Sequence, residues 1–161
     1  MRLESLILCF LLLLTPSSML FGKSGEAMVS GQSNNVLELL PNISFKKQIE
    51  GQRFSVYIIK SEFDLNGERV TLPPNSVIQF AGGRLTNGII VGQNNTIFSP
   101  LYEIFGKDLK LEGKWAVDSA YPEWFGAKSG TKEDSRPAIQ KCLNTFTRTI
   151  LSGDEYYETT L

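Results

Sequence analysis

Short segments rich in β-branched residues recur from residue 54 onward, and residues that favour turns separate them. Examples are SVYIIK at 55–60, SVIQF at 76–80 and IIV at 89–91. The centres of these segments lie roughly six to nine residues apart, and Asn-Gly, Pro-Pro-Asn and Gly-Gly fall between them. This spacing limits the chain to an all-β architecture built from many short strands.

Two all-β architectures fit many short strands. A sandwich or barrel of hairpins has turn signals about every 8 to 12 residues, whereas a parallel β-helix winds short strands into coils of about 20 to 25 residues. The dense spacing favours the β-helix. Asn87-Gly88 suits a two-residue hairpin turn, so the sandwich stays open as the alternative.

One α-helix is predicted at about residues 134–147. Asp134 and Ser135 offer N-cap oxygens, and Pro137 suits the first helical turn. The apolar positions recur at helical spacing and form one face: Ala138, Ile139, Cys142, Leu143 and Phe146. A face of this kind suits the covering of an open end of the strand coils, which would otherwise expose apolar surface and unpaired strand edges.

The N-terminus is typical of an export signal. Arg2 precedes an uncharged apolar run at residues 5–14, and Thr-Pro-Ser-Ser at 15–18 ends the run. About ten apolar residues are too few for a membrane span, which needs roughly 20, and they fit the hydrophobic part of a signal peptide. We predict a signal peptide from Met1 to about Gly22, no membrane span after its removal, and a secreted, periplasmic or cell-surface protein. An uncleaved N-terminal anchor is the alternative.

Charge and composition narrow the function classes. The formal net charge is -1, so no basic field favours nucleic acid, and we expect no nucleic-acid partner. The chain has no histidine, which excludes Ser-His-Asp and Cys-His catalysis and histidine metal sites within these residues. If cleavage of the signal peptide removes Cys9, Cys142 is the remaining cysteine and no intrachain disulfide is formed.

Residues 121–146 read YPEWFGAKSGTKEDSRPAIQKCLNTF. This stretch resembles the opening segment of the pectate-lyase-like superfamily, the right-handed parallel β-helix proteins of polygalacturonase and pectate lyase type, in an exported bacterial member. The turn departs from the family pattern, because Ser-Gly-Thr-Lys-Glu-Asp stands where the family often has Gly-Asp-Gly. The matching residues are Trp124, Phe125, Gly126, Ala127, Asp134, Ala138, Ile139 and Gln140.

The resemblance implies a fold and a domain plan. It implies a right-handed parallel β-helix whose helix covers the N-terminal end, and a chain that is an incomplete fragment of it. The expected organisation is a signal peptide at 1–22, a linker or unassigned stretch at 23–53, N-terminal strand coils at 54–120, and the start of the β-helix domain with its helix at 121–161.

The resemblance also implies a function. It predicts the N-terminal part of an exported hydrolase or lyase that acts on polysaccharides through downstream coils. The family's catalytic residues lie on those later coils, so no catalytic residue, cofactor or metal ligand is assigned here and this chain alone is predicted to be inactive. The alternative is a non-enzymatic adhesin or carbohydrate-binding surface scaffold, and the sequence leaves the choice open.

Three groups of side chains are candidate sites, and each has a structural explanation. We expect Asp134 to cap the helix with Glu133 as a solvated neighbour, since carboxylates are favoured at a helix start. The acidic residues Asp154, Glu155 and Glu158 lack regular calcium-ligand spacing, so a solvated edge is expected. The aromatic residues suit core packing more than sugar stacking: Trp115, Tyr121, Trp124 and Phe125.

Overall fold

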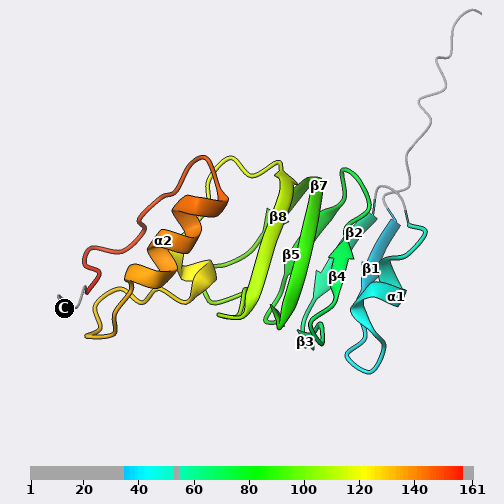
Figure 1. Cartoon of the computed structure of the whole chain (residues 1–161), viewed down its shortest axis with the longest axis horizontal. Coiled ribbons are helices and arrows are strands. Elements are labelled where there is room, and N and C mark those ends of the chain that lie inside the picture. The colour runs from blue at the N-terminus through cyan, green and yellow to red at the C-terminus, as the bar shows by residue number, and fades with distance from the viewer. Residues whose placement is uncertain (1–34, 53–54, 158–161) are drawn as a thin grey trace, which may run out of the picture. The chain divides into compact units, whose positions relative to one another are not determined.

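The computed structural model describes residues 35–52 and 55–157, which form a parallel β-helix of about 4 turns (Figure 1). The predicted signal peptide at 1–22 lies outside the described residues. The helical elements are α1 (Phe45–Ile49), the 3₁₀ helix η1 (Pro122–Phe125) and α2 (Arg136–Thr145). The strands are β1 (Asn35–Glu38), β2 (Ser55–Ile59), β3 (Glu62–Asp64), β4 (Arg69–Thr71), β5 (Val77–Phe80), β6 (Arg84–Thr86), β7 (Gly88–Phe98) and β8 (Leu109–Trp115).

The strands stack into three faces, and every pairing between named strands is parallel. One face is β1-β2-β5 with the end of β7, a second is β3-β6, and the third is β4 with the start of β7 and β8. Asn87 links β6 to β7, which belong to different faces, so Asn87-Gly88 makes no hairpin. The β-helix prediction is confirmed, and the sandwich alternative is wrong.

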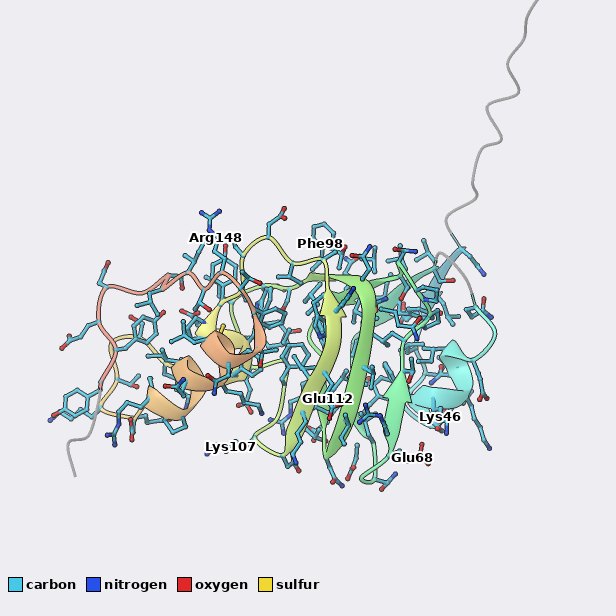
Figure 2. The ribbon with its side chains drawn as sticks, turned by 45° about the horizontal axis from the view of Figure 1, so that its top comes forward. Lys46, Glu68, Phe98, Lys107, Glu112 and Arg148 are labelled. Atoms are coloured by element: carbon cyan, nitrogen blue, oxygen red, sulfur yellow. The ribbon has the colours of Figure 1, made fainter. Side chains whose placement is uncertain are left out.

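The coil length follows from bonds between side chains on neighbouring coils. These bonds join residues 19 to 23 positions apart, as in Asn94–Asn75, Arg84–Glu62 and Asn87–Asp64. The ion pairs lie on the outside of the coils, where Glu112 accepts from Arg69 at 2.6 Å (Figure 2). Such exposed pairs add little stability, so the burial of apolar side chains inside the coils must hold the coils together.

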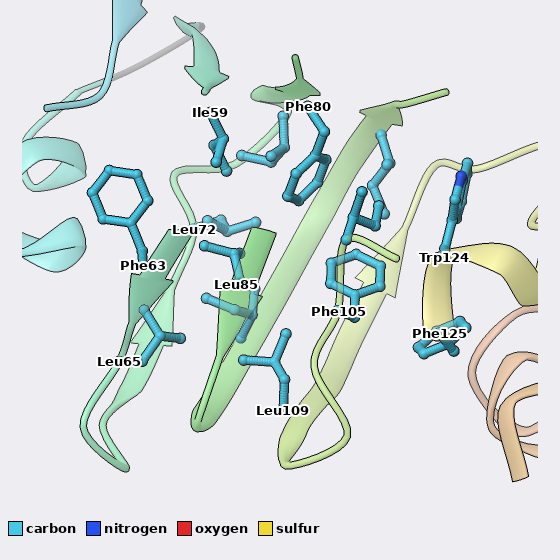
Figure 3. Packing of buried hydrophobic residues seen from close by; sticks show 14 of the residues in the cluster. Ile59, Phe63, Leu65, Leu72, Phe80, Leu85, Phe105, Leu109, Trp124 and Phe125 are labelled. Carbon is cyan, nitrogen blue, oxygen red and sulfur yellow. The ribbon is translucent and has the colours of Figure 1, made fainter. Parts of the chain in front are cut away.

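Inside the coils, apolar side chains stack in ladders (Figure 3). In β2 alternate residues are buried, because successive side chains of a strand point to opposite faces. The parallel register then places like positions beside one another: Tyr57 beside Ile78, and Phe63 beside Leu85. Leu85 in turn forms a bridge to Phe105 on the next coil. Each coil therefore buries its apolar side chains mainly by contact with the next.

Asparagine residues turn the chain at the corners. Asn66, Asn75, Asn87 and Asn94 have φ angles of 52°, 59°, 50° and 62°. Asparagine adopts this left-handed backbone more readily than other residues that carry a Cβ. Asn94 Nδ2 also donates to Asn75 Oδ1 at 2.8 Å, so one corner supports the next.

Helix α1 lies at the β1 end of the stack, in a stretch to which the sequence analysis assigned no element (Figure 1). Its residues Phe45 and Ile49 are buried. The ring of Phe45 meets that of Phe63 edge-on at 5.8 Å between centroids. Helix α1 therefore closes the core at this end.

Helix α2 lies beyond β8, at the opposite end of the described coils from β1 (Figure 1). The predicted helix is present. It was predicted to cover the N-terminal end of the β-helix, but it lies at the other end of these coils. Its buried positions are Ala138 and Cys142, whereas Leu143 is 55% exposed and Ile139 only half-buried. The apolar face predicted for this helix was thus wider than the face that is buried.

Candidate functional site

An open pocket of about 500 Å³ lies beside η1. Three parts of the chain line it: residues 101–103, residues 123–129 around the end of η1, and residues 152–153. We call it the Glu123 pocket, because Glu123 contributes the most buried charged group. Its polar lining side chains are Tyr102, Glu103, Glu123, Lys128, Ser129 and Ser152.

Glu123 is held inside η1. Pro122 occupies the first turn of this short helix, and Gly126 ends it with a φ of 92°. The side chain of Glu123 belongs to a residue only 8% exposed, and its Oε1 accepts from the hydroxyls of Ser152 and Tyr156. Its Oε2 is buried and has no hydrogen-bond partner among the described residues. A buried carboxylate oxygen without a donor is a costly feature of the fold.

Glu103 brings a second carboxylate to the same pocket. A Cβ atom at Gly126 would stand 3.3 Å from Glu103 Cδ and 3.3 Å from its Oε2, so the Glu103 carboxylate lies directly over this glycine. Glycine at 126 therefore serves two needs, a left-handed backbone and a close approach by Glu103. This gives a physical reason for the glycine in the Phe-Gly-Ala motif.

Among the described residues that line the pocket, Lys128 is the one cation, and it is already paired. Lys128 Nζ lies 2.9 Å from the Glu133 carboxylate. Within the described residues neither Glu103 nor Glu123 takes part in an ion pair. The pocket lining is thus rich in hydrogen-bond acceptors.

The motif residues predicted from the sequence are mostly packed inside the fold. Trp124, Phe125, Ala127 and Ala138 are buried. Trp124 and Phe125 lie next to the last coil (Figure 3). Of the other motif residues, Asp134 Oδ1 accepts from the Arg136 backbone N–H at 3.0 Å, and Gln140 Nε2 bonds Asn144 Oδ1 at 2.9 Å.

The remaining candidates show no assembled site. Asp134 pairs with Arg136 at 3.0 Å, but the N-cap residue of α2 is Ser135 and not Asp134 as predicted. Asp154 and Glu155 are exposed, and Glu158 lies outside the described residues. No group of three or more histidine, cysteine, aspartate or glutamate side chains that could hold a metal ion occurs within residues 35–52 and 55–157.

Cys142 is fully buried and lies 3.4 Å from Thr149 Oγ1. Burial raises the pKa of its thiol, a bond to Thr149 lowers it, and the charge of Glu123 raises it. A thiol with a raised pKa is a poor nucleophile at neutral pH, so Cys142 serves packing.

Neither Glu103 nor Glu123 was predicted from the sequence as a site residue. Each stands alone among apolar and aromatic neighbours, and no spacing motif joins them. The signal that relates them is the coil length, because residues 103 and 123 are 20 positions apart (123 − 103) and side chains bonded between neighbouring coils are 19 to 23 positions apart. That relation can be used only once the coil is known.

No protein-family model matches the chain, and neither a curated protein nor a solved structure matches it. The resemblance to the pectate-lyase-like superfamily therefore rests on the motif at 121–146 and on the β-helix fold. Among the described helices, none has the length and apolar character needed to cross a membrane.

Proposed function

We propose that this chain is the N-terminal part of an exported bacterial β-helix protein of the pectate-lyase-like superfamily that acts on polysaccharides, and that the Glu123 pocket binds one sugar unit. The observation that carries the proposal is an open pocket lined by the half-buried Glu103 carboxylate and by Tyr102. The pocket volume of about 500 Å³ is in the range of small-molecule sites.

The lining suits a sugar ring. Sugar hydroxyls donate hydrogen bonds, and bonds to a charged acceptor are stronger than those between neutral groups. Tyr102 provides an aromatic side wall fixed in place, because its hydroxyl accepts from the Gly82 N–H at 2.8 Å and donates to the Gly83 carbonyl at 3.1 Å. A fixed aromatic surface offers apolar contact with little loss of side-chain entropy.

A second candidate is a non-enzymatic adhesin or carbohydrate-binding surface scaffold. The bonds from Ser152 and Tyr156 to Glu123 Oε1 favour it, because they hold this wall of the pocket in one arrangement, as suits a binding site. Under the enzymatic proposal, hydrolase or lyase chemistry belongs to further coils, and these residues provide a binding subsite.

Calorimetric titration of the full chain with neutral and charged oligosaccharides tests the proposal. We expect measurable binding by the parent and at least tenfold weaker binding by Glu103→Gln, since hydrogen bonds to a charged group contribute about 1.5 to 3 kcal/mol. Glu68→Gln is the matched control, because Glu68 is exposed on the outside of the coils (Figure 2). Absence of binding to every oligosaccharide, or parent-like binding by Glu103→Gln, would show the proposal to be wrong.

Export is tested separately. We propose that the signal peptide is removed, so that secreted material begins between about residues 19 and 28. N-terminal sequencing of the secreted protein decides this, and a start at Met1 would contradict cleavage.

A further inference from the structure

An open pocket of about 340 Å³ lies at the C-terminal end of β8, the strand between β7 and α2 in Figure 1. Asn94, Lys114, Trp115 and residues 145–147 are among the residues that line it, and we call it the Trp115 pocket. We infer that it is a second sugar-binding site, in which the indole ring of Trp115 packs against one pyranose unit. The inference rests on the polysaccharide ligand of the proposed function and adds a site which that proposal does not use.

A β-bulge at one corner of the coils opens the Trp115 pocket. Gln93 of β7 lies opposite Lys114 of β8. The next pair is Asn95 and Trp115, so no residue of β8 stands opposite Asn94. The coil that contains β8 is therefore one residue shorter at this corner than the coil before it. The pocket lies at this corner, with Asn94 on one coil and Trp115 on the next.

Asn94 brings a hydrogen-bond acceptor to the pocket. Its Nδ2 donates to Asn75 Oδ1 on the preceding coil at 2.8 Å. A third asparagine on the following coil would donate to Asn94 Oδ1 in the same way, but the bulge leaves no residue at that position. Across residues 35–52 and 55–157, no group donates to Asn94 Oδ1. A sugar hydroxyl can take the place of the missing donor.

Trp115 is held in place by the fold. Its Nε1 donates to the Glu112 carbonyl at 3.0 Å, and the ring of Phe146 meets the indole at 6.4 Å between centroids. A Cβ atom at Gly92 would stand 2.7 Å from the indole Cε2, so the ring also packs directly against this glycine. An indole fixed in this way offers apolar contact to the C–H groups of a pyranose ring with little loss of side-chain entropy.

The Trp115 side chain lies between the core and the pocket. It lines a void of about 10 Å³ inside the coils as well as the open pocket outside them. Trp124 is 3% exposed and packs in the core as the sequence predicted, whereas Trp115 is only half-buried. For Trp115, core packing is therefore one role, and the side toward the pocket is left for a ligand.

Lys114 adds hydrogen-bond donors to the same pocket. It is exposed, and in the described part of the chain its ammonium group takes part in no ion pair. Sugar hydroxyls accept as well as donate, so they can bond to Lys114 and Asn94 together. An apolar wall with a few polar groups around it is the usual make-up of a small-molecule site.

Tryptophan fluorescence of the full chain, titrated with cellohexaose, xylohexaose and mannohexaose, tests the inference, and calorimetry measures total binding. We expect a blue shift of the emission and weaker quenching by acrylamide, because a sugar ring on the indole excludes water from it. The response should be lost in Trp115→Phe and kept in Trp124→Phe. Trp124→Phe removes no hydrogen bond, since the buried Trp124 Nε1 has no partner among the described residues.

Two asparagine variants separate the pocket from the fold. Asn94→Gly removes the acceptor, and Asn75→Gly is the matched control. Both variants remove the same bond between the two side chains, and glycine accepts the left-handed backbone of both positions. Asn94→Gly should weaken the binding seen by fluorescence roughly threefold to tenfold, whereas Asn75→Gly should bind like the parent.

Glu103→Gln separates the inference from the proposed function, since Glu103 lines the other pocket. It should leave the fluorescence titration unchanged. If calorimetry shows binding but the fluorescence does not respond, the inference is overturned and the proposed function stands. Loss of the fluorescence response in Glu103→Gln, or equal effects of Asn94→Gly and Asn75→Gly, also overturn the inference. If the fluorescence responds while Glu103→Gln binds like the parent in calorimetry, the Glu123 pocket is no sugar site and the Trp115 pocket stands. If no hexasaccharide binds, both are wrong.

Discussion

Asn95 is the residue whose side chain ties two coil corners together from the inside. It is fully buried, and its Nδ2 donates to the Pro73 carbonyl at 2.8 Å and to Ser76 Oγ at 2.7 Å. Asn95→Ala should lower the free energy of unfolding by about 2 to 4 kcal/mol, because buried acceptors lose their donor. Urea unfolding measures the loss. The exposed Gln93→Ala is the control, and a loss below about 1 kcal/mol for Asn95→Ala would show that these bonds contribute little.

Cys142 couples stability to alkaline pH. Its pKa is raised by burial above the ordinary 9.0, so the unfolded thiol releases its proton at a lower pH than the folded thiol. The stability that the buried thiol contributes is complete below pH 9.0. It is lost as the pH rises through the pKa of the thiol in the folded protein. Cys142→Ala should therefore be less stable at neutral pH but lose less stability between neutral and alkaline pH. Urea unfolding over a pH series checks this, and parallel profiles for parent and variant would contradict it.

At the scale of elements, only one side of α2 is packed into the fold. Ala138 is 8% exposed and Leu143 is 55% exposed, although both belong to the apolar face expected from the sequence. Ala138→Asp should lower the free energy of unfolding by about 3 kcal/mol or more, since it buries an unpaired charge. Leu143→Asp should change it by less than about 0.5 kcal/mol. Thermal unfolding of the two variants compares them, and equal losses would contradict the observed orientation of α2.

The sequence predicted the elements better than their contacts. Alternation in β2 and the turn residues at Asn66 and Asn87 are local signals, so the strands and the coil architecture could be predicted. The orientation of α2 could not, because its apolar positions form a stripe wider than its contact, and only tertiary packing decides which part is buried. Helix α1 was missed because its five residues are too few for a helical pattern.

The candidate site was less predictable than the fold. Glu103 and Glu123 meet because stacked coils bring positions 20 apart (123 − 103) to one place, and this depends on the number of residues in each corner. A single residue more or less in one turn would separate them. Sequence patterns report local structure, whereas this pocket is a product of long-range register.

At the scale of the whole molecule, aromatic rings link the coils in series. The Phe105 ring lies 5.6 Å from that of Phe80 on the preceding coil and 5.3 Å from that of Phe125 on the following one. Phe125 then meets Phe146, which follows α2, at 6.2 Å. In a stacked fold each coil contacts only its neighbours, so cooperative unfolding depends on these links.

Phe105 is therefore the residue whose removal should divide the molecule into two unfolding units. Phe105→Ala should cost about 3 to 5 kcal/mol and weaken the contact between the coils before and after it. The 2 tryptophans of the chain, Trp115 and Trp124, both follow Phe105, so their fluorescence reports the C-terminal side while far-ultraviolet circular dichroism reports all strands. In the parent, the urea transitions seen by the two probes should coincide. In Phe105→Ala they should separate, with Phe105→Leu intermediate and Phe98→Ala, at a side chain 62% exposed, unchanged. Coincident transitions in Phe105→Ala would show that the β-helix unfolds as one unit without this aromatic link.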